Sequence, residues 1–194
     1  MNIVKAIKSD RFERKLDNGL TEVKQECTGL RWKSHYFLDE NGKKQGEYKE
    51  WYDDGTLQEH CFYKDDEYHG ECKTWYDDGA LGEHCFFIDG DLQGEYKSWY
   101  DDGTLREHCF FKDGELQGEY KRWYTNGTLE KQCFYKDGEL HGEFKYWNDN
   151  GTLRAHYFYK DGTKHGEYKR WWDDSGTLRA HCLYKDGKII KEYI

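Results

Sequence analysis

The sequence lacks proline, a long apolar run and any excess of positive charge. Its net charge of −9 argues against nucleic acid or an anionic membrane as the default partner, because both attract positive surfaces. No stretch approaches the roughly 20 apolar residues of a transmembrane helix. Residues 1–15 lack the apolar core of a signal peptide. We therefore expect an intracellular, cytoplasmic protein that binds no nucleic acid, with membrane lipid disfavoured as a partner.

A disulfide-rich spacing is also missing, because the seven cysteines are odd in number and widely spread. Their distribution favours a reducing compartment over secretion. Aromatic residues make up 18% of the chain, which argues against intrinsic disorder.

What the sequence does contain is a repeat. A Gly-Glu pair recurs every 24 residues, at 46, 70, 94, 118, 142 and 166. The same period governs a tryptophan column: Trp51, Trp75, Trp99, Trp123, Trp147 and Trp171. Self-similarity at this spacing predicts an array of identical supersecondary units. We divide the chain into a divergent N-terminal cap (1–27), a degenerate half-repeat (28–45), six repeats (46–190) and a truncated seventh repeat that forms an edge strand (191–194).

Two turn signals punctuate each unit. The first ends in a glycine at Gly55, Gly79, Gly103, Gly127, Gly151 and Gly176. The second is an Asp-Gly pair such as 113–114. Asp and Asn tolerate positive φ before Gly, so we expect two-residue type I′ hairpin turns at both. The runs between them predict strands of about 6 residues. The fold class is therefore all-β: an elongated single-layer antiparallel β-meander of tandem hairpins, with some helix only through the cap segment 12–16.

The turn type sets which side chains share a face of the sheet. A two-residue turn pairs Tyr48 with Cys61 and Tyr52 with Leu57, and it places Lys112 opposite Glu115. One face then carries Tyr48, Tyr52, Leu57, Cys61 and Tyr63 with their repeat copies. The other carries Glu47, Lys49, Trp51, His60 and Phe62. The alternative, a three-residue loop with a glycine bulge, would pair Lys49 with Glu59 and Arg122 with Glu130.

The pattern G-E-[YF]-K-x-W-Y-x-[DN]-G-T-L, followed by [FY]-K-D-G, resembles the MORN repeat (membrane occupation and recognition nexus) over about 46–190. It is most similar to the variant form in antitoxin-like bacterial proteins and in repeat proteins of giant DNA viruses. The resemblance implies a single-layer sheet, protein or lipid contacts, frequent self-association and no catalysis. If the source is viral, it implies a location in the host cytoplasm or virion.

Adjacent His-Cys pairs suggest metal ligation: His60-Cys61, His84-Cys85, His108-Cys109 and His181-Cys182. Neighbouring residues of a strand point to opposite faces, so one pair cannot share an ion. Copies of one column lie two strands apart, ~9.6 Å, too far for a shared metal or a disulfide. Gln132 and Tyr157 also interrupt the columns. We therefore expect sheet packing, with no metal and no cofactor.

Candidate binding surfaces remain. Aromatic columns are one candidate: the six column tryptophans with Tyr48, Tyr96 and Tyr120. Lysines share the face of the tryptophans, but glutamates are expected beside them to neutralise the charge. The C-terminal segment supplies an apolar edge strand and a candidate homodimer contact: Ile189, Ile190, Tyr193 and Ile194.

An active site is one asymmetric place, whereas this chain offers the same groups six times, and no catalytic motif occurs in it. We therefore expect a non-enzymatic protein-interaction scaffold, a homodimer, with other protein partners unidentified. The alternatives are an antitoxin-like protein that binds a specific toxin and a scaffold on anionic lipid.

Overall fold

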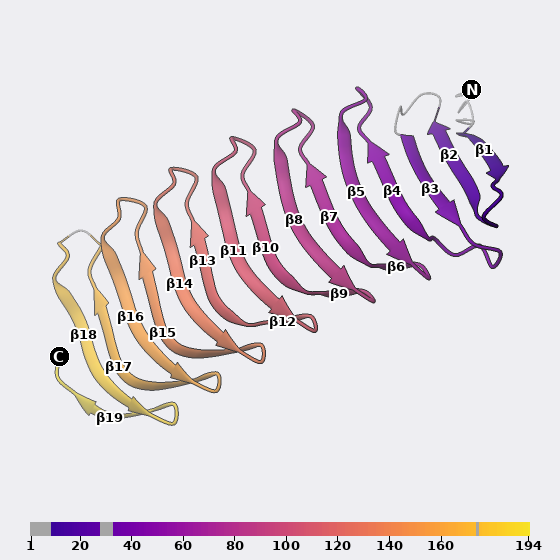
Figure 1. Cartoon of the computed structure of the whole chain (residues 1–194). Coiled ribbons are helices and arrows are strands. Elements are labelled where there is room, and N and C mark those ends of the chain that lie inside the picture. The colour runs from indigo at the N-terminus through magenta and orange to yellow at the C-terminus, as the bar shows by residue number, and fades with distance from the viewer. Residues whose placement is uncertain (1–8, 28–32, 174) are drawn as a thin grey trace, which may run out of the picture. The chain divides into compact units, whose positions relative to one another are not determined.

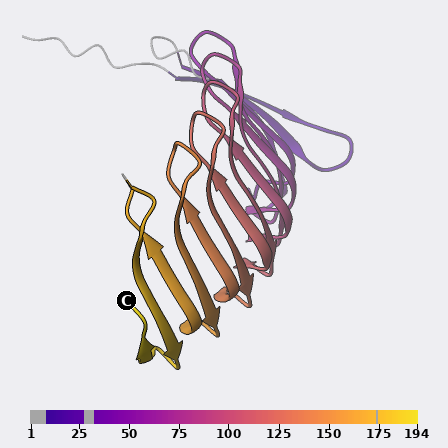
Figure 2. The same cartoon turned by 90° about the vertical axis from the view of Figure 1, so that its left-hand side faces the viewer.

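The computed structural model describes residues 9–27, 33–173 and 175–194, and all regular structure in them is β-strand (Figure 1). The chain divides into two compact units, one up to Asp91 and one from Leu92. Within each unit, consecutive strands pair antiparallel in a meander, and Figure 2 shows the strands from β10 onward in a single layer. The predicted all-β hairpin-repeat fold is confirmed. No helix in the described residues is long and apolar enough to span a bilayer.

The strands of the first unit are β1 (Ser9–Lys15), β2 (Thr21–Cys27), β3 (Lys33–Leu38), β4 (Gly46–Trp51), β5 (Leu57–Lys64), β6 (Glu67–Tyr68), β7 (Gly70–Trp75) and β8 (Leu81–Ile88). The short strand β9 (Asp91–Leu92) lies at the boundary. The second unit contains β10 (Gly94–Trp99), β11 (Leu105–Lys112), β12 (Glu115–Leu116), β13 (Gly118–Trp123), β14 (Leu129–Lys136), β15 (Glu139–Trp147), β16 (Leu153–Lys160), β17 (Thr163–Trp171), β18 (Leu178–Lys185) and β19 (Lys188–Glu192).

The first turn of repeats one to five is a three-residue loop, and that of the sixth is one residue longer, so the two-residue turn predicted there is wrong. Gly55 N donates to Tyr52 O (3.0 Å) and Tyr52 N to Thr56 O (2.8 Å). Gly55 has φ +95°, whereas the preceding aspartates have no positive φ. This is a type I turn closed by a left-handed glycine. Asp54 Oδ1 accepts a hydrogen bond from Thr56 N (2.8 Å), which is why Asp or Asn stands at this position.

A three-residue loop was expected to pair Lys49 with Glu59. The structure does not have this register, because a bulge follows the loop and shifts the pairing. Trp51, and not Tyr52, pairs with Leu57, and the register then shifts between Glu50 and Trp51. Tyr48 therefore faces Cys61, as the two-residue turn predicted. Lys49 faces His60 rather than Glu59.

The second turn is of the predicted type. Asp113 and Gly114 have φ +50° and +77°, as a type I′ turn requires, and Lys112 pairs with Glu115. The same geometry recurs at 65–66, where Asp66 replaces the usual glycine at φ +72°.

The Gly-Glu pair of each repeat marks a second bulge. Cys133 pairs with Phe144 and Tyr135 with Leu140, so three residues, 141–143, lie opposite the single residue Phe134. Gly142 accommodates the two additional residues of this bulge by adopting a positive φ of +90°. The bulge interrupts the strand in several repeats, and this adds short strands such as β12 to the predicted pair per unit.

The N-terminal segment differs from the expectation of partial helix through 12–16. Residues 9–15 form β1, which pairs with β2 over its whole length, and β2 pairs with β3. Cross-strand pairing therefore overrides whatever helical tendency this charged segment has. The turn between β1 and β2 also follows the first turn of the repeats, with Gly19 N donating to Leu16 O (3.1 Å).

Candidate functional site

Two faces follow from the strand pairing, since cross-strand partners share a face and neighbours in a strand alternate. We call the Cys face the one that carries Tyr48, Glu50, Glu59, Cys61 and Tyr63 with their repeat copies. The His face carries Glu47, Lys49, Trp51, Leu57, His60 and Phe62 with their copies. The sequence placed Leu57 on the Cys face; its pairing with Trp51 moves it to the His face.

The Cys face is the buried side. Cys61, Cys109 and Cys133 have no exposed surface. In the second unit, Cys109 and Cys133 flank Tyr120, and six partly buried side chains pack around them: Tyr96, Phe111, Leu116, Tyr135, Leu140 and Phe144. Burial raises the pKa of Cys109 to about 12. The free thiols of Cys109 and Cys133 are packing groups, as the sequence indicated for the His-Cys columns.

The His face carries a ladder of ion pairs. Glu47 Oε1 lies 2.7 Å from Lys49 Nζ and 2.9 Å from His60 Nε2. The neutralisation of the lysine column by glutamate is therefore confirmed. The same trio recurs at Glu71, Lys73 and His84; Glu95, Lys97 and His108; Glu143, Lys145 and His156; Glu167, Lys169 and His181. Glu22, Lys24 and His35 of β2 and β3 repeat it again.

Acid is expected to weaken the fold through this ladder. The hydrogen bond from lysine lowers the pKa of the ladder carboxyls, Glu95 for example, below the ordinary 4.5. A lowered folded-state pKa stabilises the fold above about pH 4.5, and this stabilisation is lost as pH falls through the lowered values. The urea midpoint should therefore be flat near neutrality and fall steeply toward pH 3. Equal midpoints at pH 7 and pH 3 would contradict this linkage.

Exposed phenylalanines next to the histidine column are a further apolar feature of both units, not included among the predicted binding surfaces. Phe86 and Phe110 are each 40% exposed and Phe134 is 37% exposed. His60, His84, His108 and His156 each contact the phenylalanine two residues later; the His108 and Phe110 ring centroids, for example, are 5.1 Å apart. In the sequence, Phe86, Phe110 and Phe134 each directly follow a cysteine of the buried column, and this adjacency could have identified them as residues of the opposite face.

The predicted aromatic surface is only partly available. All six column tryptophans are half-buried. Three of them accept a hydrogen bond from the first turn of the preceding repeat: Tyr52 Oη donates to Trp75 O (2.7 Å), Tyr100 Oη to Trp123 O (2.8 Å) and Tyr124 Oη to Trp147 O (2.8 Å). Tyr48 and Tyr120, at 9% and 7% exposed, lie in the packed Cys face, and Tyr96 packs against the same cluster. These tyrosines therefore offer little free area.

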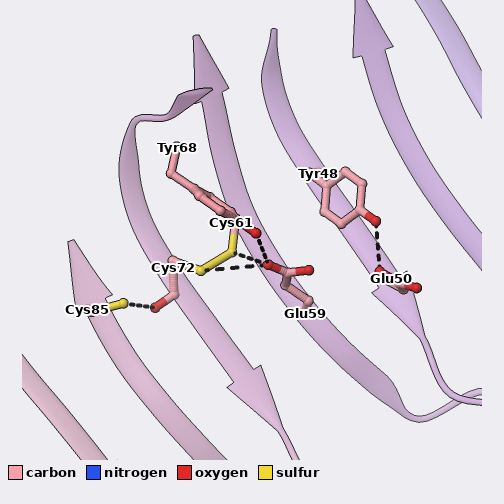
Figure 3. The surroundings of a disulfide bond; sticks show 7 residues. All are labelled: Tyr48, Glu50, Glu59, Cys61, Tyr68, Cys72 and Cys85. Carbon is pink, nitrogen blue, oxygen red and sulfur yellow. Dashed lines mark hydrogen bonds between the residues drawn. A yellow bond between two sulfur atoms is a disulfide. The ribbon is translucent and has the colours of Figure 1, made fainter. Parts of the chain in front are cut away.

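One cysteine breaks the alternation on the Cys face. Cys72 of β7 stands in the column that holds Tyr48, Tyr96 and Tyr120 in other repeats, and it forms a disulfide with Cys61 of β5, Cα atoms 4.1 Å apart (Figure 3). We excluded disulfides by comparing copies of one column, which lie two strands apart. Cys72 comes from the other column on the intervening strand, so that exclusion fails here.

Glu59 lies beside this pair. Its Oε1 atom is 3.1 Å from Cys61 Sγ and 4.0 Å from Cys72 Sγ, and Tyr68 Oη donates to it (2.9 Å) (Figure 3). Burial raises the pKa of Glu59. In the part of the chain that the structure describes, Glu59, Cys61 and Cys72 are the only His, Cys, Asp or Glu group spaced to hold a metal ion.

The C-terminal edge strand is exposed, as predicted. Ile189, Ile190 and Ile194 are 45%, 57% and 69% exposed. Tyr193 is 47% exposed but is held to β18: its N donates to His181 O (2.8 Å) and its ring stacks on His181 at 4.3 Å. The isoleucines, rather than the tyrosine, form the free apolar part of this edge.

Comparison with known proteins agrees with this geometry. A family profile described as MORN repeat variant matches residues 44–65, 92–113, 116–137 and 140–161, each of which contains one Gly-Glu strand, the first turn and the following strand. No curated protein matches the chain. MORN repeats are generally protein- or membrane-interaction motifs and are typically non-enzymatic. The chain is a MORN-repeat protein, built on the variant form of that repeat.

Proposed function

We propose that this protein is a non-enzymatic interaction scaffold that self-associates through the edge strand β19. The supporting observation is the exposed apolar surface of Ile189 and Ile190 in that strand and of Ile194 just after it. Exposed strand edges pair with other chains unless they are covered or charged. Among the described residues, β19 pairs with β18 on one side and with no strand on the other.

The sequence of β19 favours a second copy of the chain as the occupant of this edge. Antiparallel self-pairing centred on Ile190 places each Lys188 opposite Glu192 of the partner subunit, twice by symmetry. Such a contact is isologous and closes as a dimer. Cross-strand pairs of opposite charge contribute roughly 0.2–1 kcal/mol each. Ile190 meets its own copy at the centre, which adds apolar burial to the charge complementarity.

Lipid is less well supported as the partner. The lysines of the His face are already paired, Lys97 Nζ with Glu95 at 2.8 Å and Lys145 Nζ with Glu143 at 2.8 Å. An anionic surface would have to compete with these carboxylates. Co-sedimentation with phosphatidylserine vesicles would show binding if lipid, rather than protein, were the partner.

Charge placed on the edge should abolish self-association. We expect the wild-type chain to have the mass of a dimer by light scattering, and the double variant Ile190→Lys, Ile194→Lys to have the mass of a monomer. Lysine on both copies brings like charges together and removes the apolar contact. Ile88→Lys is the matched control, since Ile88 is an apolar side chain 52% exposed on β8, and it should leave the dimer intact.

A chain ending at Gly187 tests the same contact by deletion of β19 and should also be monomeric. A wild-type monomer, or a dimer that survives both changes, would refute this contact.

A further inference from the structure

The Cys61–Cys72 pair is a local departure from the repeat. On the Cys face, aromatic residues and cysteines are cross-strand partners: Tyr48 lies opposite Cys61, and Tyr120 lies opposite Cys133. In the repeat that begins at Gly70, the ring is replaced by Cys72, which faces Cys85 of β8 on its other side. Three cysteines thus occupy three successive strands, β5, β7 and β8.

Two carboxylates lie close together beside these cysteines. Glu50 and Glu59 are direct cross-strand partners, an arrangement of like charges that is destabilising. Tyr48 Oη donates to Glu50 (2.7 Å) and Tyr68 Oη to Glu59 (2.9 Å). Lys44 is a cationic group whose charge acts on Glu59, one positive charge beside two carboxylates. None of the equivalent pairs in the second unit joins two carboxylates: they are Ser98 with Glu107, Arg122 with Lys131, Tyr146 with Ala155 and Arg170 with Ala180. A cation at Glu59 would relieve the excess charge.

We propose that Cys61, Cys72 and Glu59 form a site for a thiophilic divalent cation of the Zn²⁺ type when the cysteine pair is reduced. The ligand atoms of the three residues already lie within 4.8 Å of one another. Two thiolates and a carboxylate are a ligand set that zinc accepts, with the fourth position of the tetrahedron left to water or a small exogenous ligand.

The surroundings support these three ligands. Tyr68 Oη holds the Glu59 carboxylate beside the sulfur atoms, the role of an outer-shell partner that orients a ligand. Cys85 is not a ligand, because its Sγ is directed at the Cys72 carbonyl oxygen, 3.8 Å away (Figure 3).

The disulfide and the metal are two states of one pair of sulfur atoms. Reduction by a phosphine breaks the S–S bond and yields two thiols, while water supplies the oxygen of the phosphine oxide and the two protons. Metal binding then releases the two thiol protons and transfers no electron. An ion and a disulfide therefore exclude each other at this site.

The test uses the full chain, reduced with a phosphine and desalted without oxygen. Cd²⁺ is titrated while thiolate-to-metal charge-transfer absorption is recorded, and Zn²⁺ affinity is measured against a chromophoric chelator. We expect one ion per chain, and no binding to the untreated disulfide form. Substitution Glu59→Gln should weaken Zn²⁺ binding at least about tenfold.

Cys72→Tyr is the most informative variant. It installs the residue that this column holds in other repeats, so the fold should be retained, as circular dichroism can verify, while the charge-transfer band is lost. Cys133→Ala, which removes a lone buried thiol of the second unit, should keep the stoichiometry of one. Failure of the reduced wild type to bind either ion, or equal binding by the Cys72→Tyr variant, would overturn the site. None of these outcomes depends on self-association.

Discussion

Replacing Cys109 by aspartate should remove most of the stability of the second unit, whereas the same change at the next residue, Phe110, should not. Cys109 has no exposed surface and Phe110 is 40% exposed on the opposite face. A carboxyl buried in this way has its pKa raised by about 3 units or more, which corresponds to roughly 4 kcal/mol at pH 7. Glu107, two residues away on the same face, adds repulsion.

The loss at Phe110→Asp should be near 1 to 1.5 kcal/mol, since a half-exposed ring contributes only part of its burial energy. Urea denaturation at pH 7 measures both variants. A second signature separates them: the deficit of Cys109→Asp should shrink as pH falls, because the buried carboxyl becomes neutral without cost. Equal losses at the two positions would mean that the Cys face is not the packed side of the sheet.

The 24-residue period is sufficient to predict most of this fold. It places strands between turns and keeps each column on one face. It also predicts that glutamates neutralise the lysines of the His face. Nearest-neighbour pairing decides these features, and nearest neighbours are what a repeat specifies.

The period does not reveal the bulges. Asp-Gly is compatible with both a two-residue turn, as at the second turn where Lys112 pairs with Glu115, and a three-residue turn. At the first turn, the three-residue alternative predicts a pair of opposite charges, Arg122 with Glu130. The structure places Lys131 opposite Arg122, yet Arg122 Nε still reaches Glu130 Oε2 at 2.9 Å. Charge complementarity therefore cannot choose the register, because long side chains span a shift of one residue.

Departures from the repeat are also where prediction from the repeat fails. The disulfide escapes a comparison of His-Cys copies, because Cys61 stands in that column whereas Cys72 stands in the tyrosine column. The sequence does contain the signal, because Cys72 occupies the repeat position at which Tyr48 and Tyr96 stand. Likewise, Glu22 and His35 are 13 residues apart, as Glu47 and His60 are. This spacing identifies β2 and β3 as a repeat-like hairpin, which composition alone does not show.

Proline substitutions should distinguish the two turn types by their effect on stability, although the sequence did not distinguish them. Substitution Asp113→Pro is expected to cost at least about 2 to 3 kcal/mol, because proline fixes φ near −65° and Asp113 has φ +50°. Substitution Asp101→Pro should change stability by no more than about 1 kcal/mol and in the favourable direction. Asp101 is the second residue of the Tyr100–Gly103 turn, a position that favours proline in type I turns.

The pair of variants is closely matched. Each removes one aspartate from a turn of the same repeat, and each adds the only proline of the chain, so effects on the unfolded state are similar. The hydrogen bonds of the Tyr100 turn are donated by Tyr100 N and Gly103 N, and proline at 101 removes neither. Thermal unfolding of both variants measures the difference. If Asp101→Pro were the more damaging change, the first turn could not be a type I turn, and the bulge that restores the Tyr48–Cys61 register would lose its basis.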